Sequence, residues 1–266
     1  GSVRMHSTRT RATEIRVNRE NLRGYHLADG VYFIMRRGDE FHGIQPIWDY
    51  RKLPGLTYVD TEAAFPYGED GFGTTSFVGG VSDGSIGIAA MDYAKDEVRA
   101  RKCYFFDNAG LICLGAGICA DTDRHTITTM NQCLLKSNIA ILRDGDLTDL
   151  ESVTCDISDL QGVHHDGVGY LMLEPGAVTV NTGPQSGSWR DIEEGAVITD
   201  LVTQDVFRME IDHGHHVHDA RYAYRILPGI TRDTFAATDP SDTVYVLSNT
   251  STCQAIRWGR NIGVVF

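Results

Sequence analysis

The sequence predicts an all-β fold, a large sandwich of antiparallel sheets. Apolar residues alternate along the chain or form short continuous runs, and a helical period is nearly absent. Turn signals such as Asp29-Gly30, Asp83-Gly84 and Pro228-Gly229 separate these runs, and the chain holds 28 glycines. Many strands joined by short turns are typical of sheets stacked face to face, so we expect one large sandwich.

The expected strands follow these apolar runs in order. They cover residues 31–35, 86–91, 98–106, 111–118, 127–135, 167–173, 177–181, 206–211, 221–227, 244–247 and 255–266. The segment 46–54 is expected to form a short helical turn or an ordered loop. Gly1 and Ser2 are typical of an expression-tag remnant and are left out of the fold. Residues 3–266 contain no repeat or interior linker, so we expect a single domain.

Composition excludes two classes of protein. The chain has 266 residues and a net charge of −12. A protein that binds nucleic acid needs a basic surface that displaces counterions from phosphates, and the sequence shows no basic patch. No run approaches the roughly 18 apolar residues of a membrane-spanning helix. An acidic polymer would also be repelled, so a site for one requires a local cationic patch or help from another domain.

The cysteines indicate neither a zinc site nor a redox motif. They are Cys103, Cys113, Cys119, Cys133, Cys155 and Cys253. None belongs to a CxxC pair, which argues against zinc-ribbon and thioredoxin folds. Those in apolar runs are expected to be buried thiols. Disulfide pairing stays open, because an even number of cysteines also suits an oxidising compartment.

Two short motifs suggest chemistry that their surroundings do not support. Gly80-Val81-Ser82-Asp83-Gly84 fits the pattern of a serine-hydrolase elbow, which needs a helix after the serine. Since residues 86–91 are expected to form a strand, a β-hairpin turn is favoured. The histidines of segment 213–218 could bind zinc, but no acidic or cysteine ligand lies at a recognisable spacing. We therefore favour a solvated turn between two strands.

Several longer segments occur in a specific order along the chain. They include Glu20-Asn21-Leu22-Arg23-Gly24, Gly38-Asp39-Glu40-Phe41, Pro46-Ile47-Trp48-Asp49-Tyr50, Phe77-Val78-Gly79-Gly80-Val81-Ser82-Asp83-Gly84 and Tyr222-Ala223-Tyr224-Arg225-Ile226-Leu227-Pro228-Gly229. Together, over almost the whole chain, they resemble the central β domain of the polysaccharide lyase family that includes chondroitin AC lyase, hyaluronate lyase and xanthan lyase. The resemblance is strongest to the chondroitin AC lyase branch.

The resemblance implies a supersandwich of the galactose-mutarotase-like type. In this family the domain follows an N-terminal α/α toroid, which supplies the catalytic Asn, His, Tyr and Arg, and precedes a small C-terminal sandwich. We expect this chain to lack both of these parts and to be inactive alone. The toroid of the parent polypeptide would then be its partner. The resemblance also implies a bacterial protein that is secreted or periplasmic.

The implied reaction is β-elimination in an acidic polysaccharide such as chondroitin or hyaluronan. Removal of the C5 proton of a uronate requires neutralisation of the neighbouring carboxylate, so that the developing charge can delocalise. A general base takes the proton, and an acid protonates the leaving glycosidic oxygen. This chemistry requires no metal or organic cofactor.

The resemblance also implies roles for residues of this chain. Glu40 matches a glutamate that approaches the catalytic Arg and His, where a carboxylate would orient the arginine; an exposed acidic turn is the alternative. Asn21 and Trp48 are expected at the rim of the substrate cleft, although most tryptophans fill cores. Glu69 and Asp83 match ligands of a structural calcium site in some relatives, with solvated turn carboxylates as the alternative.

Two other functions stay open. The chain could be an independent sugar enzyme of mutarotase-like architecture that uses His164, His165 or His213 with a carboxylate. That function predicts anomerisation of a free sugar. The chain could also be a non-catalytic carbohydrate-binding module, which would give Glu40 no role in turnover.

Overall fold

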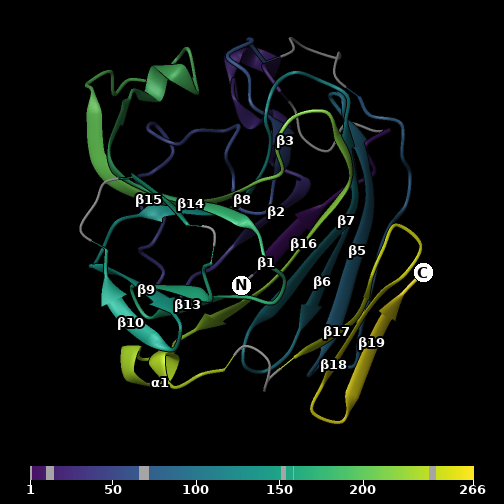
Figure 1. Cartoon of the computed structure of the whole chain (residues 1–266). Helices are drawn as coiled ribbons and strands as arrows, with labels where there is room; N and C mark the ends of the chain where they lie inside the picture. The colour runs from purple at the N-terminus through teal and green to yellow at the C-terminus, as the bar shows by residue number, and fades with distance from the viewer. Residues whose placement is uncertain (1, 10–14, 66–71, 151–153, 158, 240–243) are drawn as a thin grey trace.

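The computed structural model describes residues 2–9, 15–65, 72–150, 154–157, 159–239 and 244–266. The regular elements of this part of the chain are almost all strands (Figure 1), which confirms the predicted all-β fold. The strands are β1 (Ser2–Met5), β2 (Asp29–Phe33), β3 (Thr57–Val59), β4 (Val78–Ser82), β5 (Gly87–Lys95), β6 (Val98–Phe106), β7 (Leu111–Ala120), β8 (Thr126–Leu134), β9 (Ile139–Arg143), β10 (Asp146–Asp149), β11 (Thr154–Ile157), β12 (Gly162–His165), β13 (Val168–Met172), β14 (Ala177–Gly187), β15 (Val202–Asp212), β16 (Val217–Pro228), β17 (Tyr245–Asn249), β18 (Gln254–Trp258) and β19 (Asn261–Val265). The short helical elements are η1 (Val17–Arg19), η2 (Gly24–His26), η3 (Trp189–Asp191) and α1 (Arg232–Ala236).

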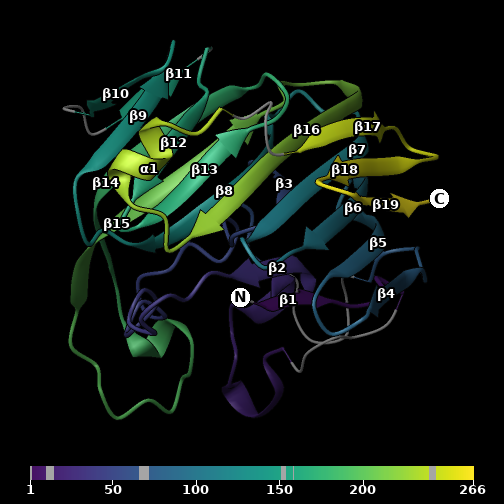
Figure 2. The same ribbon diagram turned by 90° about the horizontal axis from the view of Figure 1, so that it is seen from below.

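Two large antiparallel sheets form the body of the molecule. One has nine strands in the order β10-β9-β12-β13-β16-β7-β6-β5-β4, and the other has five in the order β11-β14-β15-β8-β3. Figure 2 shows the larger sheet from the side on which β17, β18 and β19 lie next to β5, β6 and β7. Because most neighbours in the larger sheet are joined by short hairpins, long antiparallel pairing follows directly from the turn signals of the sequence.

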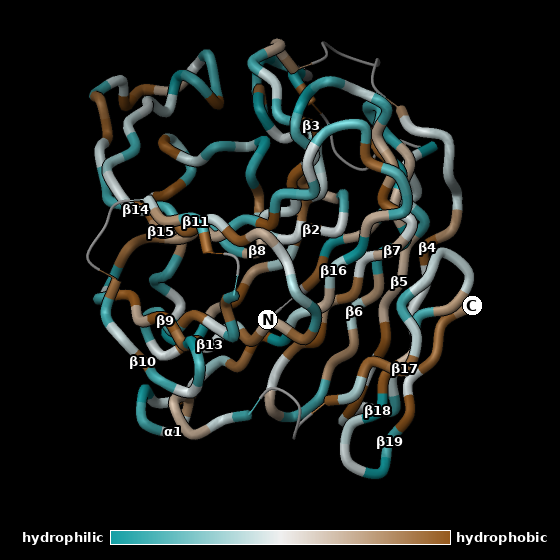
Figure 3. Tube along the Cα trace, viewed as in Figure 1, coloured by the Kyte–Doolittle hydropathy of each residue, from teal (hydrophilic) through white to brown (hydrophobic). Residues whose placement is uncertain are grey.

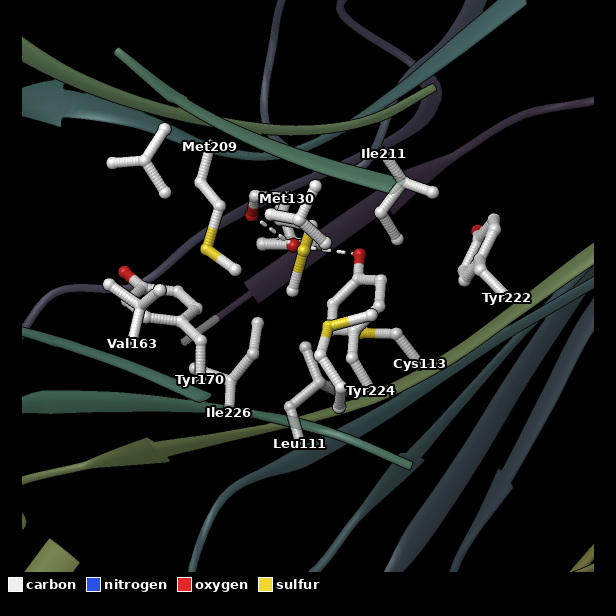
Figure 4. Packing of buried hydrophobic residues seen from close by; sticks show 14 of the residues in the cluster. Leu111, Cys113, Met130, Val163, Tyr170, Met209, Ile211, Tyr222, Tyr224 and Ile226 are labelled. Carbon is white, nitrogen blue, oxygen red and sulfur yellow. Dashed lines mark hydrogen bonds between the residues drawn. The ribbon is translucent and has the colours of Figure 1, made fainter. Parts of the chain in front are cut away.

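The main core lies between the two large sheets. Met130 of β8 and Met209 of β15 face Tyr224 and Ile226 of β16, and all four side chains are fully or almost fully buried (Figure 4). Several tyrosines in this core have bonded hydroxyls, as where the Tyr32 and Tyr224 hydroxyls lie 2.9 Å apart. Such a partner offsets the cost of burying a hydroxyl in an apolar interior, and the Tyr222 hydroxyl lacks one among the described residues.

Some strands and turns have the bounds that the local sequence pattern predicted, and others do not. β6 has the predicted bounds, and the Gly80–Gly84 motif forms the β4–β5 hairpin, in which the Asp83 amide donates to the Ile86 carbonyl. The single strand predicted over 255–266 is wrong, because a turn after Trp258 divides it into β18 and β19. The predicted turn at Asp29 is instead the start of β2. The short strands β3 and β9 to β12 were not predicted.

The sheet of β17, β18 and β19 forms a third layer. Its inner side chains, among them Ile256 and Trp258, pack on Phe105 and Ile112 of the larger sheet. Figure 3 shows apolar residues running through β17 to β19 as they do through the main sheets. The outer face of this small sheet leaves Tyr245 and other apolar side chains exposed.

None of the six cysteines forms a disulfide, and all six lie in the described part of the chain. Cys103, Cys113 and Cys133 are buried thiols, as predicted, but the same prediction is wrong for Cys119, which is only half-buried near the end of β7. Burial raises the pKa of Cys133 to about 12, so the thiol stays protonated and unreactive at neutral pH. Within the described residues, no helix has the length and apolar character needed to cross a membrane.

Candidate functional site

Two neighbouring cavities lie beside the loop that follows β3. The larger has a volume of about 830 Å³ and lies between η1, the 47–51 loop and the outer end of the β14–β15 hairpin. The smaller has about 270 Å³ and lies between η2, β3 and the tip of the β5–β6 hairpin. Arg51, Ala63, Ala64 and Phe65 line both cavities and form the wall between them. These cavities are the candidate binding site.

Trp48 lines the larger cavity from within the core. Only 5% of its surface is exposed, and its indole N–H donates to the Gln132 carbonyl at 3.2 Å. Its ring lies against Phe33, Phe41 and Tyr50, at centroid distances between 5.6 and 5.8 Å. The structure therefore places Trp48 in the cavity wall, where its first role is packing. A role in substrate binding stays a prediction.

Asn21 lies next to this cavity rather than in its lining. It adopts a left-handed backbone with φ of 49°, and its carbonyl accepts a hydrogen bond from the Gly24 amide at 3.4 Å. The following Leu22 amide donates to the Ile192 carbonyl at 2.8 Å, which joins this segment to the loop after η3. Leu22 and Arg23 are the residues of this turn that face the cavity.

Glu40 is buried, so the exposed acidic turn considered for it is wrong. Only 5% of its surface is exposed. Its carboxylate accepts hydrogen bonds from the amides of Arg36, Arg37 and Gly38 at 2.8, 2.7 and 2.8 Å. Burial alone would raise the pKa of Glu40, but these amide donors outweigh it and lower the pKa to about 2. Glu40 is ionised and braces its own loop; its proposed contact with a catalytic arginine and histidine stays a prediction.

Of the two predicted calcium ligands, Asp83 lies in a turn and Glu69 lies outside the described residues. Glu69 falls within 66–71, which the structure does not describe. Asp83 is exposed, and its Oδ1 accepts from the Ser85 and Ile86 amides at 2.8 and 2.9 Å. These amide donors lower the pKa of Asp83. In the described ranges, no three His, Cys, Asp or Glu side chains are grouped as they would be around a metal ion.

The histidines considered as acid or base groups are held in structural contacts. His165 is buried, stacks on Phe207 with a centroid distance of 4.5 Å, and accepts from the Lys136 amide. His164 bonds the Ile230 carbonyl at 3.1 Å. His213, half-buried in the β15–β16 connection, bonds the Thr128 hydroxyl at 2.9 Å. Burial lowers the pKa of both His165 and His213 to about 4, so neither is suited to general acid–base chemistry near neutral pH.

A buried ionic cluster that the sequence analysis missed borders the smaller cavity. Asp29 Oδ2 accepts from Lys95 Nζ and pairs with His26 Nδ1, both at 2.8 Å. Burial raises the pKa of Asp29, but the His26 hydrogen bond and the Lys95 charge outweigh it and lower the pKa. Lys95 Nζ also lies 3.6 Å from the Tyr25 ring centroid. Asp29 and Lys95 are 66 residues apart, so no local motif could have identified the pair.

Two broad antiparallel sheets stacked face to face, with a small third sheet packed on the larger one, define a domain of the super-sandwich class. The model of the polysaccharide lyase family 8 super-sandwich domain matches residues 1–239, and the chain belongs to this family. The family inferred from the ordered sequence segments is thereby confirmed.

Curated and solved relatives agree with this assignment. The chain is 36% identical over 260 residues to a chondroitinase AC of Pedobacter heparinus, which covers 96% of this chain and 36% of the relative. It is 30% identical to a hyaluronate lyase of Enterococcus faecalis over 95% of this chain and 27% of that protein. A chondroitinase AC lyase solved with oligosaccharides superposes with a TM-score of 0.85 at 34% identity, over 96% of this chain and 38% of that structure. A Paenibacillus xanthan lyase also superposes at 0.85, with 25% identity, over 96% of this chain and 26% of that structure. The chain thus spans between about a quarter and two fifths of the length of these relatives.

Proposed function

We propose that this chain is the super-sandwich domain of a lyase that cleaves a uronate-containing polysaccharide, such as chondroitin or hyaluronan, by β-elimination. The observation that carries the proposal is the superposition of 96% of the chain on a chondroitinase AC lyase solved with oligosaccharides. That match covers 38% of the relative. The proposal therefore includes a parent polypeptide in which another part holds the rest of such an enzyme. In this proposal a helical toroid supplies the acid and base, and this chain lines one side of the cleft.

The protonation states of the ionisable side chains favour an auxiliary role for this chain over independent catalysis. Glu40 is ionised and bonded to its own loop, and Asp29 is ionised between a lysine and a histidine. His165 is neutral and buried. An acid and a base that work near neutral pH need pKa values near that range, which these three groups do not have.

The partners follow from the proposed reaction. The chain would contact an acidic polysaccharide through the two cavities and the toroid through the surrounding loops. Relatives named for chondroitin and hyaluronate support this class of polymer. We also propose a secreted or periplasmic location, because a polymer of this size is cut where it occurs, outside the cytoplasm.

Glu40 and the calcium ligands enter the proposal in limited roles. A carboxylate offers about four acceptor positions, so three amide donors leave roughly one for a residue of the toroid. If Glu40 acts there, Glu40→Gln in the parent enzyme lowers turnover; unchanged kcat and KM at an equal folded fraction would remove it from the site. A structural calcium ion near Asp83 would raise the unfolding temperature when calcium is added, and a chelator would reverse the effect.

The lyase function is tested by following the unsaturated uronate product by its absorbance. The purified chain alone should produce none from chondroitin or hyaluronan, whereas the parent polypeptide that carries a toroid should produce it. Robust elimination by the 266 residues alone, or a parent polypeptide without a helical domain, would contradict the proposal.

A further inference from the structure

The guanidinium of Arg51 belongs to the wall between the two cavities. Its Cζ lies 4.0 Å from the centroid of the Phe65 ring. Among the described residues, no carboxylate forms an ion pair with it. A guanidinium stacked on an aromatic ring keeps its N–H donors in the plane at its edge, where they can bind a carboxylate or sulfate with two parallel hydrogen bonds. Arg51 is therefore available to an anion.

A buried glutamine holds the loop that carries Arg51. Gln132 is fully buried on β8, and its Oε1 accepts from the Asp49 amide at 2.9 Å. Its Nε2 donates to the carbonyls of Asp49 and Lys52 at 3.0 and 2.6 Å. The Asp49 carboxylate in turn accepts from the Arg51 amide at 3.0 Å. The backbone on both sides of Arg51 is thus fixed before any ligand arrives, which reduces the entropy lost on binding.

The carboxylates that line the larger cavity are mostly engaged elsewhere. Asp191 accepts from the Ser188 amide in the cap of η3, and Glu194 pairs with an arginine of η1. Asp49 accepts from the Arg51 amide, which leaves Glu62 as an exposed carboxylate in this lining. This lining holds four carboxylates and also four arginines, which are Arg16, Arg23, Arg51 and Arg190, so its charges balance in number. The wall shared by the two cavities carries only the positive charge of Arg51, although the whole chain carries −12.

The smaller cavity is lined by aromatic rings together with charged side chains, among them Lys95, Asp96 and Glu97. Tyr25, Tyr58 and Tyr93 line it, and each has at most 5% of its surface exposed. The hydroxyls of Tyr25 and Tyr58 donate to Asp96 and Glu210, so these rings are fixed in place. Its volume of about 270 Å³ is near the lower end of small-ligand pockets, roughly 300 Å³. The half-buried Phe65 also lines this cavity, and it gives an aromatic surface against which the C–H face of a sugar ring can pack.

From this arrangement we infer that the two cavities form one polysaccharide subsite centred on Arg51. Its guanidinium binds the carboxylate or sulfate group of one sugar residue, and the aromatic cavity receives the apolar face of the neighbouring residue. Phe65 is the platform that orients the guanidinium. The inference rests on the proposed function for the class of polymer, and it assigns the local cationic group that a polyanion needs on an acidic protein.

Binding of defined hexasaccharides to the 266-residue chain tests this subsite by calorimetry. The ligands are hyaluronan, which has carboxylates only, chondroitin 4-sulfate, which has both anions, and carboxyl-reduced hyaluronan, which is neutral. Arg51→Gln should weaken binding of an anionic ligand about tenfold, the effect of losing one charge-assisted hydrogen-bonded contact. Arg143→Gln is the matched control, because Arg143 is an exposed arginine at the end of β9, away from both cavities, and should change affinity less than about twofold.

Comparison of the three hexasaccharides identifies the anion that Arg51 binds. A tenfold loss for hyaluronan assigns the carboxylate, and a loss confined to chondroitin 4-sulfate assigns the sulfate. Phe65→Leu should weaken binding about threefold by removing the platform, and it provides a second variant if Arg51→Gln does not fold.

Four results would overturn the subsite. They are no binding of any anionic ligand by the unsubstituted chain, equal affinity for the neutral ligand, unchanged affinity in the folded Arg51→Gln and Phe65→Leu variants, and equal losses in Arg51→Gln and Arg143→Gln. Each of these results leaves the lyase assay of the parent polypeptide independent, so failure of the subsite and failure of the proposed function are distinguishable.

Discussion

Two loops of this domain hold charged residues in opposite ways. The 36–40 loop closes on its own carboxylate, since three amides donate to Glu40 and bury it. The 49–52 loop is held by Gln132 from the neighbouring sheet, and this leaves the guanidinium of Arg51 directed to the cavities. A charge in a loop is available to a ligand when another group fixes the backbone around it. The charge of Glu40 therefore stabilises its own loop, whereas the charge of Arg51 is available to a ligand.

The largest expected effect is on the loop that carries Arg51. Gln132→Ala removes three hydrogen bonds from a fully buried site and should lower the free energy of unfolding by about 3 kcal/mol in urea titrations. Gln204→Ala on β15 is the matched control, because its amide makes one long bond of 3.4 Å to the Gly43 carbonyl and should cost at most about 1 kcal/mol. Equal effects would show that Gln132 does not fix the 49–52 loop.

The next effect concerns the loop that closes on its carboxylate. Glu40→Gln should lower the free energy of unfolding by about 2 kcal/mol at pH 7, since an amide cannot accept from all three N–H groups. The folded pKa of about 2 lies below the ordinary 4.5, so this stability is present above pH 4.5 and is lost as the pH falls toward 2.

Asp39→Asn provides the comparison for that variant. Asp39 is adjacent in sequence but half-exposed, with surface pairs to Arg37 and Lys136, and its loss should leave the free energy of unfolding almost unchanged. Similar values for the two variants would mean that the buried carboxylate does not brace the loop.

A smaller effect is expected in the pH dependence of the free energy of unfolding, through the buried His165. Burial lowers the folded pKa of His165 to about 4 from the ordinary 6.5, so the unfolded chain binds the proton more readily. Stability should therefore fall as the pH drops from 6.5 toward 4, by about 1–2 kcal/mol, and His165→Phe should flatten this slope in chemical denaturation.

His216 should show the opposite sign. Hydrogen bonds to Asp121 and Asp123 raise its folded pKa, so its contribution is present below pH 6.5 and is lost as the pH rises through the raised pKa. His216→Asn removes this trend in the same assay.

A slope between pH 6.5 and 4 that His165→Phe leaves unchanged would contradict the neutral, buried state of His165.

The smallest expected effect on stability is that of replacing Arg51. Arg51→Gln should change the free energy of unfolding by less than about 0.5 kcal/mol, because the half-buried side chain stacks on Phe65 and forms no ion pair with a described residue. Arg225→Gln supplies the contrast, since Arg225 is buried and bonds Asp107 at 2.9 Å, and breaking such a pair costs about 3–5 kcal/mol. A large loss for Arg51→Gln would make Arg51 a structural residue.

The sequence was informative where one strand and its turn decide the structure. Alternation along 98–106 predicted β6 to the residue, and Asp83-Gly84 predicted the β4–β5 hairpin. The order of short segments was sufficient to recognise the polysaccharide lyase family. The short strands β9 to β12 were not predicted, because runs of four or five residues become strands here through pairing with partners that the local pattern does not show.

The sequence by itself determined the all-β class, the main strands and the family, since these depend on period-2 alternation and turn residues that are read locally. Only the tertiary structure decided which charges are buried, paired or free. Asp39 and Glu40 are adjacent acidic residues, yet one is half-exposed and the other is enclosed by its loop. Nothing in the sequence distinguishes Arg51 from the other arginines. In the structure, Gln132 of β8 bonds the backbone of its loop, and Phe65 of the loop after β3 stacks on its guanidinium. The physical reason is that desolvation and hydrogen-bond partners set the state of a charge, and those partners come from distant parts of the chain.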